Sequence, residues 1–250
     1  MTGPPSRSSF GLVSTPLPDM GAISHEHPDV TGGWLRPAVF GAMDGLVSNF
    51  ALVMGVTGGS TDTEPVLLAG LAGLAAGAFS MAAGEYTSVA SQSEYALAQI
   101  QVEREEIERN GPAEEAELAA MFVQKGVEEG TARDVAAQIH RDLEHAVDVH
   151  AREELGIDPH DLASPRLAAA SSFLAFAAGA VVPLLPLLLG ITAVWPIVVL
   201  SLLGLFACGA IVTQVTARSW WYGGMRQLLL GGAAAGITYL IGDLVGATLA

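Results

Sequence analysis

Acidic side chains inside otherwise apolar stretches are the first residues of this sequence that could do chemistry. Asp44 lies in the first long apolar run, and Met81 and Glu85 lie one helical turn apart in the second. A carboxylate in hydrocarbon is costly unless it is paired, protonated or hydrated. No Lys or Arg lies deep enough in any apolar run to neutralise these two acids. A cation or a proton is therefore the expected partner, and Ser48 and Asn49 would add oxygen ligands beside Asp44.

Each of these residues also has a simpler interpretation. Asp44 could be a protonated packing residue, and Met81 could fill ordinary core space. Glu85 could be hydrated near the membrane interface, and Ser48 and Asn49 could make hydrogen bonds between helices. Because Asp44 and Met81 lie at a similar depth in the membrane, a role in binding a transported cation is favoured over these simpler interpretations.

A second acidic group lies between the second and third apolar runs, at residues 92–166. Helical spacing places six of its polar side chains on or beside faces that should be buried: Glu103, Glu106, Glu114, Glu117, His150 and Glu154. Converging carboxylates are unstable unless a positive group joins them. Carboxylates with one imidazole suit Mn(II), Fe(II), Zn(II) or Co(II), so the pattern predicts a divalent metal site and no organic cofactor.

Several other titratable residues of this segment are expected to face solvent. They include His140, His145 and a set of outward-pointing acids: Glu105, Glu108, Glu115, Glu128 and Glu129. The Glu-x-x-His pair of di-iron oxidases is absent from the segment, so ferroxidase chemistry has little support.

Composition restricts the class of protein. Of 250 residues, 51% are hydrophobic and 15% are charged, and the formal charge is −15. Disorder and an ordinary soluble enzyme are both disfavoured, and phosphates would be repelled, so nucleic acid is not an expected partner. Residues 92–166 hold 18 of the 26 acids and 7 of the 11 bases, which indicates a membrane protein with one charged insert. The single Cys208 allows no disulfide within the chain.

The fold class that follows is an all-α membrane protein with five transmembrane helices and a cytoplasmic three-helix acidic insert between spans two and three. The stretches long enough to span a bilayer are 37–57, 66–88, 167–189, 193–216 and 227–249. Pro183 and Pro186 should bend the third. The four-residue spacings of Gly41 with Gly45 and Gly73 with Gly77 predict close helix packing.

The division of the chain and its orientation follow from the same pattern. We expect a disordered cytoplasmic tail at 1–35, spans one and two at 36–91, the metal-binding insert at 92–166 and spans three to five at 167–250. All eleven basic residues fall on one side of this topology, which predicts a cytoplasmic N-terminus and insert and an outer C-terminus. In the tail, His25 and His27 are expected to be solvated.

Three helices are expected to form the insert. The second span should continue as one long helix as far as Asn110-Gly111-Pro112, which is a stop-and-restart signal. A second helix is expected over about 113–125. A third is expected from Thr131, with Asp134 as its capping partner, to Gly156.

Two runs resemble the first two spans of the vacuolar iron transporter family, which includes the yeast-type cross-complementer proteins. They are GAMDGLVSNFALVMGV from Gly41 and LAGLAGLAAGAFSMAAGEYTSV from Leu68. The resemblance covers about 36–250, and the bend at Pro183 and Pro186 also fits it. The composition, rich in Ala and Gly, suggests a bacterial member in the plasma membrane.

The resemblance implies a homodimeric five-span transporter that moves Fe(II), and often Mn(II), out of the cytosol in exchange for protons. It implies a transmembrane site at Asp44 and Met81. It also implies a cytoplasmic site built from two Glu-x-x-Glu pairs, Glu103 with Glu106 and Glu114 with Glu117, and from Glu154. Plant-type members carry Met ligands one turn before that last Glu, where this chain has His150 and Ala151.

The leading hypothesis is a proton-coupled exporter of divalent metal. A membrane metal buffer or sensor would need the insert but not Asp44. A passive cation channel would give flux without proton movement and would depend little on Glu103 or Glu154. An enzyme is disfavoured, because no nucleophile-base arrangement or phosphate loop is present.

Overall fold

The computed structural model describes residues 33–60, 62–213 and 218–249, and all regular structure in these ranges is helical. Most of the expected tail at 1–35, with His25 and His27, lies outside the described residues. Within the described ranges, five helical stretches are long and apolar enough to cross a membrane. They are α1 (Leu35–Gly59), the first part of α2 (Thr63–Gln124), α5 (Pro165–Val181) with its short extensions, α7 (Val194–Val212) and α8 (Trp220–Leu249).

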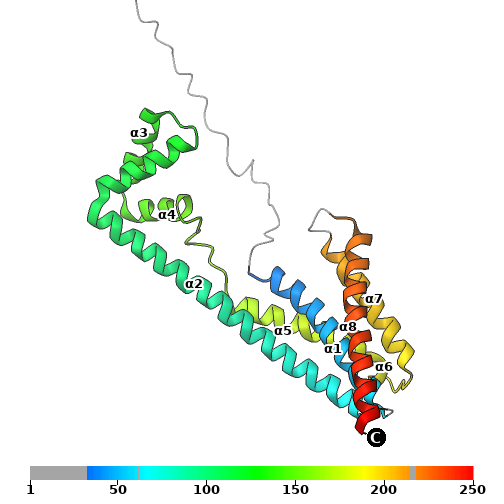
Figure 1. The fold of residues 1–250 in the computed structure, drawn as a ribbon. Coiled ribbons are helices and arrows are strands. Elements are labelled where there is room, and N and C mark those ends of the chain that lie inside the picture. Colours follow the sequence, from blue (N-terminus) through cyan, green and yellow to red (C-terminus); the bar gives the residue numbers. More distant parts are fainter. Residues whose placement is uncertain (1–32, 61, 214–217, 250) are drawn as a thin grey trace, which may run out of the picture.

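The five spans form one bundle, and the segment between the second and third spans projects from it (Figure 1). Successive spans run in opposite directions, so the starts of α1, α5 and α8 lie at the end of the bundle from which α2 projects. The described Arg residues of the spans and their loops are found at those starts: Arg36, Arg166, Arg218 and Arg226. This arrangement agrees with the predicted five-span topology.

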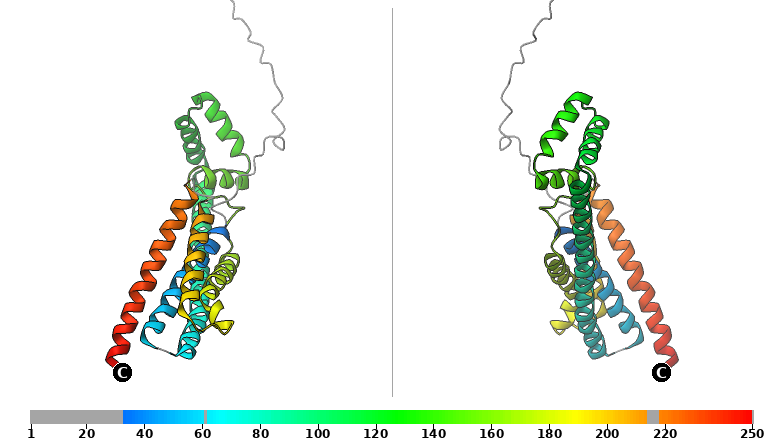
Figure 2. Two further views of the ribbon diagram at one scale, coloured as in Figure 1. Left: turned by 90° about the vertical axis from the view of Figure 1, so that its right-hand side faces the viewer. Right: turned by 90° about the vertical axis from the view of Figure 1, so that its left-hand side faces the viewer.

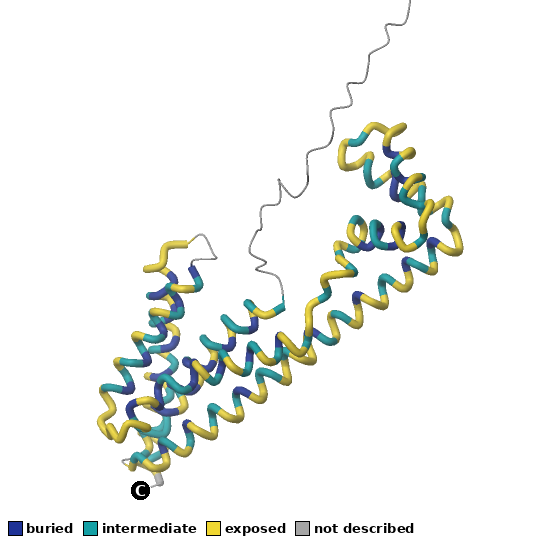
Figure 3. The backbone as a smooth tube through the Cα atoms, turned by 180° about the vertical axis from the view of Figure 1, so that it is seen from behind, coloured by how far each residue is buried: buried dark blue, intermediate teal, exposed yellow. Residues whose placement is uncertain are grey.

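Glycine allows α1 to lie at the centre of the bundle, against α5 and α8 (Figure 2). A Cβ atom at Gly45 would overlap the backbone carbonyl group of Phe176, and one at Gly179 would overlap that of Ala42. The helices therefore approach as closely as the spacing of Gly41 and Gly45 predicted. Leu46 and Phe50 fill the core beside them. Many residues of the spans are exposed (Figure 3), and the exposed set includes many large apolar side chains.

Two prolines end the regular part of the third span, as predicted. Pro183 lies in a 3-10 turn, η2 (Val182–Leu184), and Pro186 lies in the single helical turn α6 (Leu185–Leu188) that follows. Proline removes a backbone donor and crowds the preceding turn, so the helix cannot continue straight. The last span, α8, begins at Trp220, seven residues earlier than its apolar run at 227–249 indicated.

The second span leaves the bundle as a single long helix, as predicted. α2 runs to Gln124, and its one residue with non-helical backbone angles is Asn110 (φ −142°, ψ 41°). The expected stop at Asn110-Gly111-Pro112 is therefore present as the kink at which one helical segment ends and another begins, and the second segment, which ends at Gln124, agrees with the helix expected over about 113–125. Gly126, with φ of 94°, follows it.

The expected helix from Thr131 to Gly156 is wrong, because the chain forms two shorter helices there. α3 spans Glu129–Ile139 and α4 spans Leu143–Glu153. α3 ends with His140 as its C-cap residue, and Asp142 starts α4, since its carboxylate accepts a hydrogen bond from the backbone N–H of His145 (2.8 Å). The start also differs: Glu128, not Thr131, is the N-cap residue of α3.

Candidate metal-binding sites

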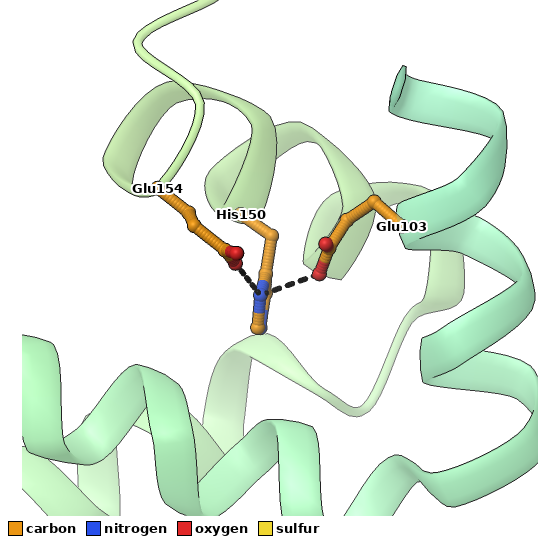
Figure 4. Close-up of side chains that lie close together, drawn as sticks. All are labelled: Glu103, His150 and Glu154. Carbon is orange, nitrogen blue, oxygen red and sulfur yellow. Dashed lines mark ion pairs between the residues drawn. The ribbon is translucent and has the colours of Figure 1, made fainter. Parts of the chain in front are cut away.

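Three predicted ligands from different parts of the chain meet where α4 packs on α2. Glu103 lies on α2, His150 lies on α4, and Glu154 follows α4 directly. One ligand atom from each lies within 4.8 Å of the other two. His150 Nδ1 is 2.8 Å from Glu103 Oε1 and 3.7 Å from Glu154 Oε2 (Figure 4).

Apolar packing and ion pairs between α2 and α4 position these side chains. Ile107, one turn beyond Glu103, is buried with Ala146 and Val147 of α4. At the rim, Arg104 binds Glu144 through two nitrogen-oxygen contacts of 2.5 Å. Exposed ion pairs contribute little stability, so the apolar contact is the main reason that the two helices stay together.

Two side chains of the cluster are buried, and the two of their atoms that face each other, Glu103 Oε1 and His150 Nδ1, lack hydrogen bonds. Glu103 is 4% exposed and His150 is fully buried, whereas the side chain of Glu154 is 35% exposed. Although Glu103 Oε1 and His150 Nδ1 are close, their geometry is not that of a hydrogen bond, and neither atom has another hydrogen-bond partner. Buried polar atoms without partners are rare. A cation bound between them, entering beside Glu154, would satisfy both.

The electrostatics of the cluster also favour a cation. Burial, followed by the negative charges of Glu154, Glu114, Glu106 and Glu117, raises the pKa of Glu103 to about 7. Burial lowers the pKa of His150, so this ring is held neutral with a free lone pair. A neutral imidazole beside crowded carboxylates is the form in which histidine binds a metal.

The other three predicted acids surround this cluster without joining it. Glu106 lies 3.8 Å from Arg109, Glu114 is half-buried, and Glu117 is exposed. Their charges raise the pKa of Glu103, so they strengthen the negative field at the site. Of the six predicted ligands, Glu103, His150 and Glu154 are the three whose ligand atoms lie within 4.8 Å of one another.

A second candidate site lies between the spans. A cavity of about 250 Å³ is lined by four of the predicted transport residues, Asp44, Ser48, Asn49 and Met81. Asn49 is buried, and its amide group donates a hydrogen bond to the carbonyl oxygen of Ala180 (2.6 Å). Its Oδ1 atom has no partner. The cavity thus gathers a carboxylate, a free amide oxygen and a thioether, and none of its lining residues is basic.

Gly73 and Gly77 of α2 let this cavity exist. A Cβ atom at Gly73 would lie 3.0 Å from Asn49 Oδ1, and one at Gly77 would overlap the ring of Phe176. Side chains at these two positions would therefore fill the space beside Asp44. Both glycines belong to the predicted packing pair, so this pair has a role in the site as well as in helix contact.

Three positions differ from the sequence interpretation. Glu85 is half-buried but does not line the cavity, whereas Ser80, which sequence reasoning missed, does. Its signal was a hydroxyl directly before Met81 within an apolar run. His140 was expected to face solvent, but it is half-buried, and its Nε2 atom lies 3.0 Å from Nε2 of His150. His145 is exposed, as expected.

Comparison with known proteins gives a consistent set of matches that spans both sites. A family model described as the VIT family matches residues 35–243. A protein named vacuolar iron transporter from Acanthamoeba castellanii is 40% identical over 181 residues, which is 71% of this chain and 66% of that protein. The protein named vacuolar iron transporter 1 from Oryza sativa subsp. japonica is 30% identical over 86% of this chain and 88% of that protein. The protein of the same name from Arabidopsis thaliana is also 30% identical, over 88% of this chain and 90% of that protein.

Proposed function

This chain belongs to the VIT family, and we propose on that premise that it is a proton-coupled transporter that exports Fe(II) or Mn(II) from the cytosol. The named relatives are vacuolar iron transporters. The observation that carries the proposal is the cavity within the spans, where Asp44, Asn49 and Met81 present two kinds of oxygen and one thioether sulfur. Hard oxygen and soft sulfur ligands together suit a first-row divalent metal such as Fe(II).

The cluster of Glu103, His150 and Glu154 is proposed to capture the ion before transport. It is formed by the segment that projects from the bundle, at the end where the Arg residues gather. By the distribution of basic residues, that end is cytoplasmic. Captured metal would therefore come from the cytosol, and the direction of transport would be outward.

One helix links the two proposed sites. Met81 and Glu103 both belong to α2, with no irregular residue between them. Their 22-residue separation corresponds to roughly 33 Å at 1.5 Å per residue. A continuous helix of this kind holds the capture site at a fixed distance from the cavity, and its acidic flanks, Glu106 and Glu114, would raise the local concentration of cations.

Competition for one carboxylate is the proposed basis of proton coupling. Asp44 in its cavity can hold a metal ion or a proton, but not both at once. After the metal leaves toward the outside, Asp44 and Glu85 would take up protons from that side and return them to the cytosol. Export of one divalent ion would thus be coupled to import of protons.

The proposed assembly is a homodimer that closes the path. In the single chain Asp44 and Ser48 are exposed, although they lie within an apolar span. A carboxylate facing lipid is costly, and a second copy of α1 across this face would remove it from lipid. The Ala- and Gly-rich composition supports a bacterial plasma membrane as the location.

A membrane metal buffer or sensor is the second candidate. It is favoured by the fact that the capture cluster needs no residue of the five spans. In this case the chain would bind metal and transport none.

Flux measurements on the purified full chain in liposomes distinguish these functions. Internal Fe(II) or Mn(II) and internal pH would be followed together after metal is added outside. Metal and proton movement in opposite directions supports the exporter. Metal flux that leaves the pH unchanged contradicts proton coupling, and bound metal without flux assigns the buffer.

A further inference from the structure

Two histidine rings meet behind the capture cluster. His140 follows α3 as its C-cap residue, and its Nε2 atom lies 3.0 Å from Nε2 of His150. The ring centroids are 5.2 Å apart and the planes are inclined by 75°. This distance is that of a hydrogen bond between ring nitrogens.

The contacts of His150 assign its two nitrogen atoms to different tasks. Nδ1 faces Glu103 and Glu154 (Figure 4), so this nitrogen is the one that can bind a metal held by the two carboxylates. A neutral imidazole carries one proton. If Nδ1 supplies a lone pair to the metal, the proton resides on Nε2, which faces His140.

The proton on His150 Nε2 then fixes the state of His140. Two N–H groups pointed at each other would repel, so the Nε2 atom of His140 must be the acceptor, and His140 must carry its own proton on Nδ1. Metal-binding histidines generally donate their second ring N–H to an outer partner, which sets tautomer and ring orientation and raises ligand basicity.

We propose that His140 is a positioning residue of the capture site, which accepts a hydrogen bond from His150 Nε2–H and thereby presents His150 Nδ1 to the metal. This inference rests on the proposed metal capture by Glu103, His150 and Glu154. It depends on the break between α3 and α4, because that break brings His140 back against α4.

Substitutions at His140 that remove its hydrogen-bond acceptor but keep an aromatic ring test whether His140 positions His150. Co(II) is titrated into the detergent-solubilised full chain, and its visible absorption bands and the number of ions bound are recorded. His140→Phe keeps an aromatic ring but has no acceptor. His140→Gln restores an acceptor oxygen, and His145→Leu removes an exposed histidine of α4 as the control.

We expect His140→Phe to weaken Co(II) binding by roughly 10- to 100-fold, the usual cost of losing such an outer partner, with the number of bound ions unchanged. His140→Gln should recover most of the affinity and the absorption bands of the original chain, and His145→Leu should change neither. If His140 only filled space, His140→Gln would not bind Co(II) more tightly than His140→Phe. If His140→Phe does not fold, His140→Leu takes its place in the comparison.

Two results would overturn the proposal. Unchanged affinity and absorption in His140→Phe would mean that His150 needs no acceptor. Loss of one bound ion in both His140→Phe and His140→Gln would make His140 a ligand, with both Nε2 atoms on one metal. Glu103→Gln, measured alongside, reports on the capture site itself: if it also binds Co(II) unchanged, the site assigned under the proposed function is wrong.

Discussion

Glu103 and His150 lie 2.8 Å apart between Oε1 and Nδ1, on two different helices, and both side chains are buried without a hydrogen bond between them. Folding has taken both groups out of water, and neither satisfies the other. Leaving two buried polar atoms without hydrogen-bond partners costs free energy. In the proposed capture site, a divalent cation would offset this cost for the carboxylate and the imidazole at once, with Glu154 as the third ligand at the open side.

Glu154→Gln should weaken metal binding by roughly tenfold or more, which corresponds to a loss of about 1.4 kcal/mol of binding free energy. The amide keeps the shape of the side chain but removes the charge that faces His150. Isothermal titration of Mn(II) into the detergent-solubilised chain measures the affinity.

Glu108→Gln is the matched control for this variant, because Glu108 is exposed on α2 and lies outside the cluster. Equal weakening by both substitutions would show that the acidic segment attracts cations only through its total charge.

The metal-free chain should lose stability as the pH rises from 4.5 to about 7, because the pKa of Glu103 is raised over this interval. Across it the folded state binds more protons at Glu103 than the unfolded state does, so the free energy of unfolding falls with rising pH, and the loss is complete above pH 7. Thermal unfolding in EDTA, measured from pH 4.5 to 8, follows this change.

Glu103→Gln isolates the contribution of this carboxyl group. The pKa values of His140 and His150 are lowered by burial, so these rings oppose folding below about pH 6.5 and act in the other direction. The difference between the original chain and Glu103→Gln removes their effect. The same pH dependence in both proteins would contradict the environment assigned to Glu103.

Gly45→Ala should destabilise the spans by about 1–3 kcal/mol, the usual cost of forcing an extra group into a packed interface. The added Cβ would overlap the carbonyl group of Phe176, which is backbone and cannot rotate away. Gly84→Ala is the control, since no atom lies within 4 Å of its added Cβ. Thermal unfolding in detergent should separate the two, and equal midpoints would refute the close packing of α1 on α5.

Met81→Leu should reduce Fe(II) flux more than Mn(II) flux. Leucine keeps the volume of the side chain but lacks the thioether, and a soft sulfur ligand contributes more to Fe(II) than to the harder Mn(II). Competition between the two ions in liposomes measures the ratio. An equal reduction for both would mean that Met81 shapes the cavity without binding the ion.

The membrane spans could be predicted because span length and apolar composition are local properties of the chain. The path of α2 was equally readable, since no Gly or Pro interrupts it between Gly84 and Asn110. The capture cluster followed from helical spacing: His150 and Glu154 continue the apolar stripe of their segment, and Glu103 does so on α2. These residues share a face whether or not the exact helix ends are known.

The remaining features depend on contacts that no local pattern reveals. The residues around Asp142 fit a continuous helix, and only its cap to the backbone of His145 shows the break. Without that break, His140 would remain on the outer face, where the sequence placed it. Ser80 and the open space at Gly73 and Gly77 were missed because a cavity depends on how several spans pack together.

The measurement that tests the central claim most directly is proton-coupled Fe(II) flux in liposomes for the original chain, Asp44→Ala and Glu154→Ala. Asp44→Ala should abolish both metal flux and the opposing proton movement, and Glu154→Ala should weaken both without abolishing them. Asp134→Ala, which removes an exposed acid of α3, should behave as the original chain does. Undiminished, pH-dependent flux in Asp44→Ala would contradict the mechanism.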